Sequence, residues 1–202
     1  QRDGLERQRR WGEFFAGSQA MRFAYADPPY IGQAKRHYGD DPRCAEVDHG
    51  ELIERLNGYD AWALSLSSPS LKQIIALCPD DVRVMAWVKP FAVFRPNVNP
   101  AYAWEPVIVR GGRRRERAEA TVRDWVMANI TLRRGTHGAK PAAFCRWLFD
   151  VLGMEPGDEF NDLFPGSGAV TRAWEARCAK QEHRIGLFDN GDGSTALPGV
   201  AP

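Results

Sequence analysis

Short apolar runs alternate with amphipathic segments along this chain. Apolar runs of about four to eight residues bounded by turn residues are typical of buried strands. Such runs stand at residues 21–26, 61–66, 81–88, 104–109, 159–164 and 183–188. Elsewhere, apolar residues recur at helical spacing, as Leu52, Ile53 and Leu56 do. The pattern predicts helices at residues 50–57, 71–78, 141–152 and 170–180, and a long polar loop at residues 31–49.

Strands that alternate with helices predict an α/β fold with a mostly parallel central sheet flanked by helices. A chain of 202 residues suits one compact domain and is short for two, so we expect residues 1–202 to form a single domain. In open α/β sheets, ligands bind at the carboxyl ends of the strands. Asp27 and Gly166 each come just after a predicted strand. These two positions are therefore the first candidates for chemistry.

Composition places the chain among soluble globular proteins. Hydrophobic residues make up 44% and charged residues 26% of the sequence, which is typical of that class. We expect neither a membrane span nor a secretory signal, because no run of about eighteen apolar residues occurs and no apolar stretch follows the basic amino terminus. The four cysteines are scattered without metal-ligand spacing, which predicts reduced thiols and no metal site. Together these features predict a cytoplasmic protein.

Positive charge is unevenly placed, although the net charge is only +1. Residues 1–19 form a basic extension and residues 110–139 a basic loop region. We expect the loop region to contact nucleic-acid phosphates around the mouth of the site, through Arg110, Arg113, Arg114, Arg115, Arg133 and Arg134. Acidic residues dilute this charge, so solvated surface loops are the alternative interpretation. The tail at residues 190–202, with Gly, Pro and Ser, is predicted to be loose.

The sequence Asp27-Pro28-Pro29-Tyr30 follows the first predicted strand. Proline has no N–H group and a fixed φ, so two prolines in a row expose backbone oxygens beside the carboxylate. Asp27 and the Pro28 carbonyl could accept the two N–H groups of an exocyclic amine, while Tyr30 stacks on its ring. Such a grip suits methyl transfer to an amino nitrogen, because both hydrogen bonds draw the lone pair out of conjugation. The alternative is an ordinary Asp-Pro turn at the end of a strand.

A second motif, Phe164-Pro165-Gly166-Ser167-Gly168, joins a predicted strand to a predicted helix. Its glycines allow a ligand to approach the backbone closely, and the free N–H groups of the new helix face that ligand. A phosphate or a carboxylate could bind there equally well. The motif lacks the third glycine of the dinucleotide fingerprint and the Lys-Ser/Thr of a P-loop. Alone, a motif this short does not identify a ligand; it carries weight in combination with Asp27-Pro28-Pro29-Tyr30.

Together the two motifs resemble the signatures of the S-adenosylmethionine-dependent amino-methyltransferases of nucleic acids. The catalytic tetrapeptide comes first and the glycine motif last, which resembles the circularly permuted, beta-class order of phage and bacterial members. Lys140-Pro141 resembles the Lys-Pro that opens a helix beside the methionine end of the cofactor. Residues 84–90 and 104–109 resemble later core strands of these members and of the messenger-RNA adenine branch. The resemblance spans residues 20–190 and implies the Rossmann-like class I methyltransferase fold.

The resemblance also implies S-adenosyl-L-methionine as the cofactor and two sets of site residues. The catalytic set is Asp27, Pro28, Pro29 and Tyr30. The cofactor-binding set is Asp27, Lys140, Pro141, Asp162, Phe164, Pro165, Gly166, Ser167, Gly168 and Asp189. Asp189 is assigned to the ribose after a strand at residues 184–189, although Phe188 holds the expected acid position and a one-residue slip would turn the side chain to the other face. Lys140 is expected to be a structural marker rather than a base.

The implied activity is methyl transfer to an exocyclic amino group of a base. Adenine N6 in DNA is favoured, because Asp at the first motif position resembles the adenine enzymes. Cytosine N4 in DNA and adenine N6 in RNA remain alternatives, as does a non-catalytic nucleic-acid-binding subunit with a degenerate methyltransferase fold. Residues 110–139 stand where restriction-associated members carry a target-recognition domain. We therefore expect short or relaxed sequence specificity, or recognition completed by a specificity subunit or within a homodimer.

Several other residues have two interpretations. His37 and Tyr38 could close over a base flipped out of a duplex or lie on a surface loop, and His137 could line the pocket. Lys89 and Glu105 could contact the substrate or form a salt bridge with each other. Most tryptophans stand within apolar runs and are predicted to be core residues rather than base-stacking platforms, namely Trp62, Trp87, Trp104, Trp125, Trp147 and Trp174.

Overall fold

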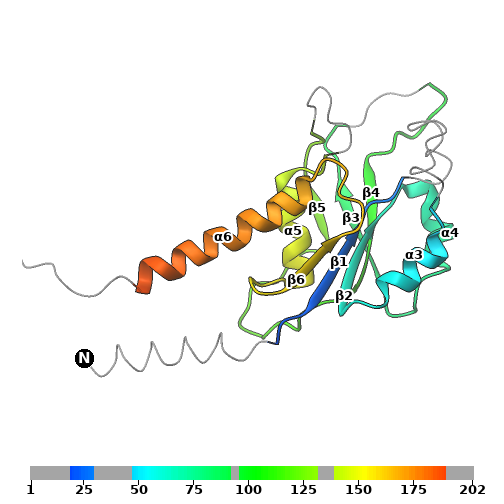
Figure 1. The fold of residues 1–202 in the computed structure, drawn as a ribbon. Coiled ribbons are helices and arrows are strands. Elements are labelled where there is room, and N and C mark those ends of the chain that lie inside the picture. The colour runs from blue at the N-terminus through cyan, green and yellow to red at the C-terminus, as the bar shows by residue number, and fades with distance from the viewer. Residues whose placement is uncertain (1–18, 30–46, 92–95, 132–138, 190–202) are drawn as a thin grey trace, which may run out of the picture.

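The computed structural model describes residues 19–29, 47–91, 96–131 and 139–189. Within these residues, six strands form one sheet in the order β5-β3-β4-β2-β1-β6 (Figure 1). They are β1 (Arg22–Ala26), β2 (Ala61–Ser65), β3 (Arg83–Val88), β4 (Trp104–Gly111), β5 (Trp125–Met127) and β6 (Glu159–Asp162). β4 runs antiparallel to β2 and β3, and the other paired strands are parallel. The predicted α/β fold with a mostly parallel sheet is confirmed.

Helices cover both faces of this sheet (Figure 1). α3 (His49–Leu56), the 3₁₀ turn η2 (Ser68–Ser70) and α4 (Leu71–Ile75) belong to one face, and α5 (Ala142–Leu152) and α6 (Ala169–Asp189) to the other. Alternate side chains of a strand point to opposite faces. Phe23 and Tyr25 of β1 therefore join the core under α5, whereas Ala24 and Ala26 join the core under α3.

The two ends of the strands define two sides of the sheet. β1, β2, β3 and β6 end on one side, which we call the carboxyl side, and begin on the other, the amino side. Because β4 is antiparallel, it begins on the carboxyl side, where Trp104 pairs with Val88. It ends on the amino side, where Gly111 pairs with Ala61. The loop that follows β4 therefore starts on the side of the sheet opposite Asp27.

This placement overturns one expectation for the basic region. Arg110 forms an ion pair with Asp81 at 2.8 Å on the amino side, and Arg113 binds Asp158 there. The predicted position of these arginines around the mouth of the site is wrong, because the antiparallel direction of β4 carries the chain away from Asp27. Arg133 and Arg134 lie outside the described residues. Contact between the basic region and nucleic acid stays a prediction.

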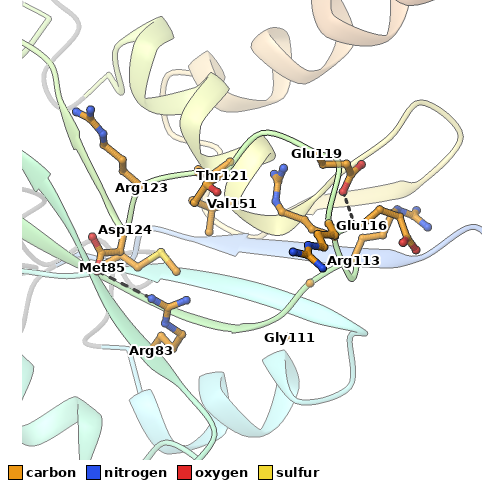
Figure 2. Close-up of a pocket in the computed structure, with 14 residues that line it drawn as sticks. Arg83, Met85, Gly111, Arg113, Glu116, Glu119, Thr121, Arg123, Asp124 and Val151 are labelled. Carbon is orange, nitrogen blue, oxygen red and sulfur yellow. Dashed lines mark hydrogen bonds and ion pairs between the residues drawn. The ribbon is translucent and has the colours of Figure 1, made fainter.

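The amino side also holds an open pocket of about 420 Å³ (Figure 2). Charged side chains of both signs line it, including Arg83, Arg113, Arg115, Arg117, Arg123, Glu116, Glu119 and Asp124. Arg115 donates to the backbone carbonyls of Ala120 and Asp150, and Arg83 lies 3.9 Å from Asp124. Some of the arginines that line the pocket therefore stabilise the loop between β4 and β5.

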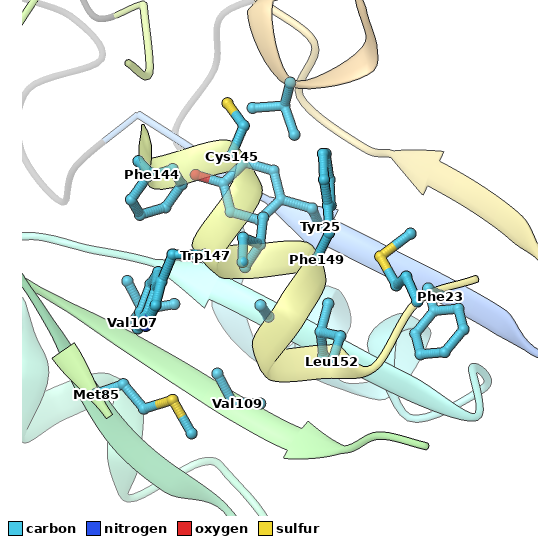
Figure 3. Close-up of a cluster of buried hydrophobic side chains, with 14 of the residues drawn as sticks. Phe23, Tyr25, Met85, Val107, Val109, Phe144, Cys145, Trp147, Phe149 and Leu152 are labelled. Atoms are coloured by element: carbon cyan, nitrogen blue, oxygen red, sulfur yellow. The ribbon is translucent and has the colours of Figure 1, made fainter. Parts of the chain in front are cut away.

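α5 supplies much of the core on its face (Figure 3). Phe144, Leu148 and Leu152 are fully buried and follow the spacing of one helical face. The Phe144 ring lies 5.3 Å from the ring of Trp87 and 6.1 Å from that of Tyr25, measured between centroids. α5 begins directly after Pro141. Its packing therefore fixes Lys140, the residue before that proline, against the carboxyl side.

α6 corrects the prediction for the end of the chain. It runs from Ala169 to Asp189 and extends beyond the sheet (Figure 1), so the strand predicted at residues 183–188 is wrong. A short apolar run cannot be told from a helical segment by periodicity alone, and no proline interrupts the sequence here. β5 lies within the region expected to be loop. No described helix combines the length and the apolar character needed to cross a membrane.

The tryptophans divide into two groups. Trp62, Trp87, Trp147 and Trp174 are buried, as predicted. Trp104 and Trp125 are 38% and 39% exposed, so the prediction that they are core residues is wrong. Trp125 lies on β5, at one end of the strand order, and Trp104 is the first residue of β4. Both positions lie at the margin of the sheet, and the Arg123 guanidinium lies 5.4 Å from the Trp125 ring centroid.

Candidate active site

Two segments that are far apart in the sequence meet on the carboxyl side. β1 pairs with β6 in parallel, with Tyr25 opposite Asp162, and the Leu163 N–H donates to the Tyr25 carbonyl at 2.9 Å. Asp27 follows β1, and the glycine turn follows β6. Asp27 and the glycine turn therefore lie on the same side of the sheet after adjacent strands, as the sequence predicts.

Asp27, Lys140, Glu105 and Lys89 form a chain of ion pairs in which negative and positive side chains alternate. Lys140 Nζ lies 3.1 Å from Asp27 Oδ1 and 3.3 Å from Glu105 Oε2. The other carboxylate oxygen of Glu105, Oε1, binds Lys89 Nζ. The predicted salt bridge between Lys89 and Glu105 is therefore confirmed. Lys140 thus ties Asp27 to the ion pair between Lys89, directly after β3, and Glu105 of β4.

Aromatic rings support the two ammonium groups. Lys140 Nζ lies 5.0 Å from the Trp87 ring centroid and 5.6 Å from that of Phe144. Lys89 Nζ lies 4.9 Å from the Trp87 ring. A ring face attracts a cation electrostatically, most strongly when the cation is desolvated. Lys140, whose side chain is only 6% exposed, is therefore stabilised by carboxylates and by ring faces.

The surroundings shift the pKa values of this pair. Burial raises the pKa of the Asp27 carboxyl above its ordinary value of 3.8, and the charges of Glu105 and Asp162 add to the rise, while Lys140 opposes it. Burial alone would lower the pKa of Lys140, but Asp27 and Glu105 outweigh it, so the pKa is raised above 10.5. Lys140 is therefore a fixed positive charge at neutral pH, and it is not suited to act as a base.

The glycine turn presents open backbone next to this pair. Gly166 and Gly168 have φ values of 47° and 68°, which favour glycine. A Cβ built on Gly166 would have only the Phe164 carbonyl within 4 Å, at 3.8 Å. α6 begins directly after the turn, at Ala169. The turn therefore offers a ligand both close backbone approach and the amino end of a long helix.

Asp162, the last residue of β6, carries an unpaired oxygen. Its Oδ2 accepts a hydrogen bond from Thr171 Oγ at 3.0 Å. Its Oδ1 is buried and has no hydrogen-bond partner among the described residues. Burial raises the pKa of this carboxyl, against hydrogen bonds from the Thr171 hydroxyl and the Phe164 backbone N–H. A buried carboxylate oxygen is costly without a well-placed donor, so Oδ1 is available to a further donor group.

The remaining predicted residues fall into four groups. Pro28 is buried and Pro29 half-buried beside Asp27, and Pro141 directly precedes α5. Phe164 and Ser167 are half-buried in the turn, with Pro165 exposed between them. Tyr30, His37, Tyr38 and His137 lie outside the described residues. Asp189 ends α6 instead of following a strand, so the basis for assigning it to the ribose is absent, and its side chain is not described.

Sequence reasoning underrated the Lys140 and Glu105 side chains. Lys140 was expected to be a structural marker, yet its ammonium group contacts Asp27 directly. Glu105 was only one of two candidates for substrate contact. A sequence signal exists for Glu105. It is a charged residue two positions before the buried Val107, so both side chains point to the same face of β4. No group of three His, Cys, Asp or Glu residues that could hold a metal ion occurs among the described residues.

Comparison with known proteins bears on the fold. No protein-family model matches the chain, and no curated protein does. Among solved structures, the crystal structure of the M1.HpyAVI–SAM complex matches with a TM-score of 0.53 and 16% identity over 84% of this chain and 82% of that chain. The crystal structure of M1.HpyAVI matches with a TM-score of 0.50 and 14% identity over 83% and 81%. At these identities the likeness shows a shared fold, and the predicted Rossmann-like fold is confirmed.

Proposed function

We propose that this chain is an S-adenosylmethionine-dependent methyltransferase of nucleic acids, with the circularly permuted motif order, and that it acts on adenine N6 in DNA. The observation that carries the proposal is the meeting of Asp27 with the glycine turn across the β1–β6 pair. One segment offers an acceptor for an amine, and the other offers open backbone to a donor molecule. The likeness to M1.HpyAVI, whose crystal structure includes SAM, supports the cofactor.

The residues of the turn fit S-adenosylmethionine. The methionine part of this molecule carries an ammonium group, which can donate to the unpaired Oδ1 of Asp162. Phe164, Gly166, Ser167 and Gly168 form the turn that would hold the rest of the cofactor, with open backbone at Gly166 and the Arg172 side chain against Gly168. When bound, the cofactor supplies an electrophilic methyl group on its sulfonium. The protein's own residues would bind and orient the amine and the cofactor.

Asp27 is the residue that prepares the amine. Among the described residues, its Oδ1 has one partner, Lys140, which leaves Oδ2 to accept an N–H of the target amino group. That hydrogen bond allows the nitrogen to become pyramidal as its lone pair leaves conjugation. Asp27 need not remove a proton first, since the N–H becomes acidic once the nitrogen is quaternised, and the Asp27 carboxylate that accepts this N–H can then take its proton. Lys140 keeps the carboxylate ionised and prevents it from rotating.

Positioning provides the larger share of catalysis in this scheme. Holding both reactants in a near-attack geometry can lower the barrier by roughly 7–11 kcal/mol. The site suits this role, because Asp27 and Asp162 lie at the ends of adjacent paired strands and Lys140 is fixed by α5. The base amine and the methyl donor would thus be held by residues at the ends of β1 and β6, directly after two strands of the sheet.

The direct test is methyl transfer from labelled S-adenosylmethionine to duplex DNA, single-stranded DNA and RNA, followed by nucleoside analysis of the product. We expect N6-methyladenine in DNA. Absence of transfer to every polymer, with calorimetry showing no binding of the cofactor, would refute the proposal. N4-methylcytosine, or label only in RNA, would refute the assignment of the base or of the polymer.

Gly166→Ala is expected to weaken cofactor binding roughly tenfold or more, which corresponds to about 1.4 kcal/mol. The new methyl group would project from the turn into the space that the cofactor needs, since only the Phe164 carbonyl lies within 4 Å on that side. Gly157→Ala is the matched control. Gly157 also has a positive φ, of 99°, and open surroundings, but it lies away from the turn. Calorimetry should show a loss of affinity for Gly166→Ala alone; equal affinities in the two variants would contradict the assignment.

The pH dependence of transfer should report the Asp27 carboxyl. Only the ionised form accepts the amine N–H, so the rate falls as pH drops through the raised pKa, and the acid limb lies above 3.8. Glu105→Gln removes a charge that raises this pKa and should move the limb to lower pH. The measurement is kcat against pH for both proteins. If the acid limb of kcat lies at the same pH in Glu105→Gln as in the unaltered protein, a group other than Asp27 controls the limb.

A further inference from the structure

The face of the sheet that carries α3 and α4 is uncovered at β3 and β5. The core under these two helices takes its strand residues from β1, β2 and β4, and among the described residues it contains none from β3 or β5. On the opposite face, Met85 and Trp87 of β3 and Val126 of β5 pack into the core under α5. Successive side chains of a strand alternate between faces, so the neighbours of these three residues project from the α3 face.

The pairing of the strands defines the residues of this uncovered area. Residues that pair across two strands project from the same face of the sheet. Met127 of β5 pairs with Val88 of β3, which pairs with Trp104 of β4, and the neighbouring row continues the same face. We call the resulting area the sheet patch, which consists of Val84, Ala86, Val88, Trp104, Pro106, Trp125 and Met127.

The sheet patch is apolar and open to solvent. Met127 is 55% exposed, Val84 40%, Trp125 39% and Trp104 38%. A strand with one solvated face alternates apolar and polar residues, whereas a strand buried on both faces has a continuous apolar run. β3 is apolar without interruption from Val84 to Val88. It therefore has the sequence of a strand covered on both faces, although the described residues cover only one of them.

We propose that a second copy of this chain covers the sheet patch, which makes the protein a two-fold symmetric homodimer. The four exposed side chains present roughly 350 Å², if a large side chain has about 150–250 Å² of surface. A stable interface takes about 800 Å² from each partner, of which somewhat more than half is apolar. The sheet patch therefore supplies most of the apolar surface that one side of such a dimer needs.

The chemistry of the sheet patch suits an identical partner. Two sheets pack face to face through interdigitating side chains, and a second copy brings the same apolar face. A two-fold contact joins the same surface of both subunits, so that surface must be complementary to itself. The sheet patch meets this condition because none of its residues is charged. For the same reason it offers no cation to the phosphates of a nucleic acid.

The border of the sheet patch also suits a two-fold contact, because charges of both signs lie at its amino-side end. The Arg123 guanidinium lies 5.4 Å from the Trp125 ring centroid. Asp81, just before β3, has a side chain that is 63% exposed. A second copy brings the same two charges, so attractive pairs can form at the rim.

The test measures the association of the full chain by sedimentation equilibrium at several concentrations, without cofactor or nucleic acid. We expect a reversible dimer. Met127→Lys should raise its dissociation constant roughly 100-fold or more, because each copy would bury an ammonium group in an apolar contact without a counter-charge. Val84→Lys should have a similar effect, since Val84 lies on the neighbouring strand of the same patch.

Ala179→Lys is the matched control. Ala179 is an exposed apolar residue of α6, which belongs to the other face of the sheet. The same added charge should therefore leave the dissociation constant unaltered. Met127→Leu keeps the sheet patch apolar and should also dimerise. Because Met127 is exposed in a single copy, dilute Met127→Lys should unfold at the same urea concentration as the dilute unaltered protein.

The outcomes separate this proposal from the proposed function, on which it does not rest. A monomer at every concentration would overturn it. A dimer that persists in both Met127→Lys and Val84→Lys, or that Ala179→Lys weakens equally, would also overturn it. Absence of methyl transfer by an intact dimer would refute the proposed function alone, and a fully active monomer would refute the homodimer alone.

Discussion

Asp27→Asn should reduce the rate of methyl transfer by about 10²- to 10⁴-fold, the range that a positioned acid–base group contributes. Asparagine keeps the size of the side chain, and its carbonyl can still accept from Lys140, which lies 3.1 Å from Asp27 Oδ1. The amide NH₂ would then face the amine of the base, so two donors would meet where one acceptor is needed. Single-turnover kinetics with saturating cofactor measures this loss, and calorimetry should show that the cofactor still binds.

Asp81→Asn is the control for Asp27→Asn. Asp81 also pairs with a basic side chain, Arg110, but on the amino side of the sheet. The same chemical change there should leave the transfer rate unaltered. If Asp27→Asn retains the full rate, Asp27 does not prepare the amine and the mechanism fails. If both variants lose activity equally, the effect comes from weakened folding rather than from the site.

The position of the candidate site could be predicted from the sequence because it depends on two local features. Asp27 and Gly166 each follow a strand, and in parallel strands that position lies at the same side of the sheet. The double proline and the two glycines are backbone requirements, which are visible in a single sequence. Fold class followed from the alternation of strands and helices for the same reason. These expectations needed no knowledge of long-range contacts.

The errors came from features that only tertiary structure decides. The apolar pattern of β4 does not reveal its direction, so the basic loop after it was expected at the mouth of the site. The final apolar run predicts a strand but forms the end of α6, because short runs have no distinct period. Trp104 stands in an apolar run but begins a strand at the margin of the sheet. Its exposure depends on what packs around it.

The contact between Lys140 and Asp27 shows how fold and site depend on each other. α5 exists because an apolar helical face packs on the sheet, with Phe144 in van der Waals reach of Tyr25 and Trp87. That packing fixes Lys140 where its charge offsets the burial of Asp27 and Glu105. A buried carboxylate that must stay ionised needs such a cation. The helix that completes the core therefore also maintains the chemistry of the site.

Lys140→Met should destabilise the fold at neutral pH, by less than the about 3–5 kcal/mol that breaking a fully buried ion pair costs, because the Asp27 side chain is 24% exposed. Methionine keeps an unbranched side chain for the contact with Phe144, but Asp27 loses its cation while Glu105 keeps Lys89. Urea unfolding measures the loss. Lys89→Met is the control, because Lys89 is 18% exposed and Glu105 keeps Lys140 in that variant. Its loss should be clearly smaller.

The loss in Lys140→Met should also depend on pH. Without the cation, the pKa of Asp27 rises further in the folded state, while the unfolded value stays near 3.8. The folded variant therefore binds a proton more tightly than the unfolded chain, so its stability relative to the unaltered protein recovers as pH falls toward the unfolded pKa. Unfolding at neutral and at mildly acidic pH measures this recovery. A deficit that is the same at both pH values, or equal to that of Lys89→Met, would mean that Lys140 does not hold an ionised Asp27.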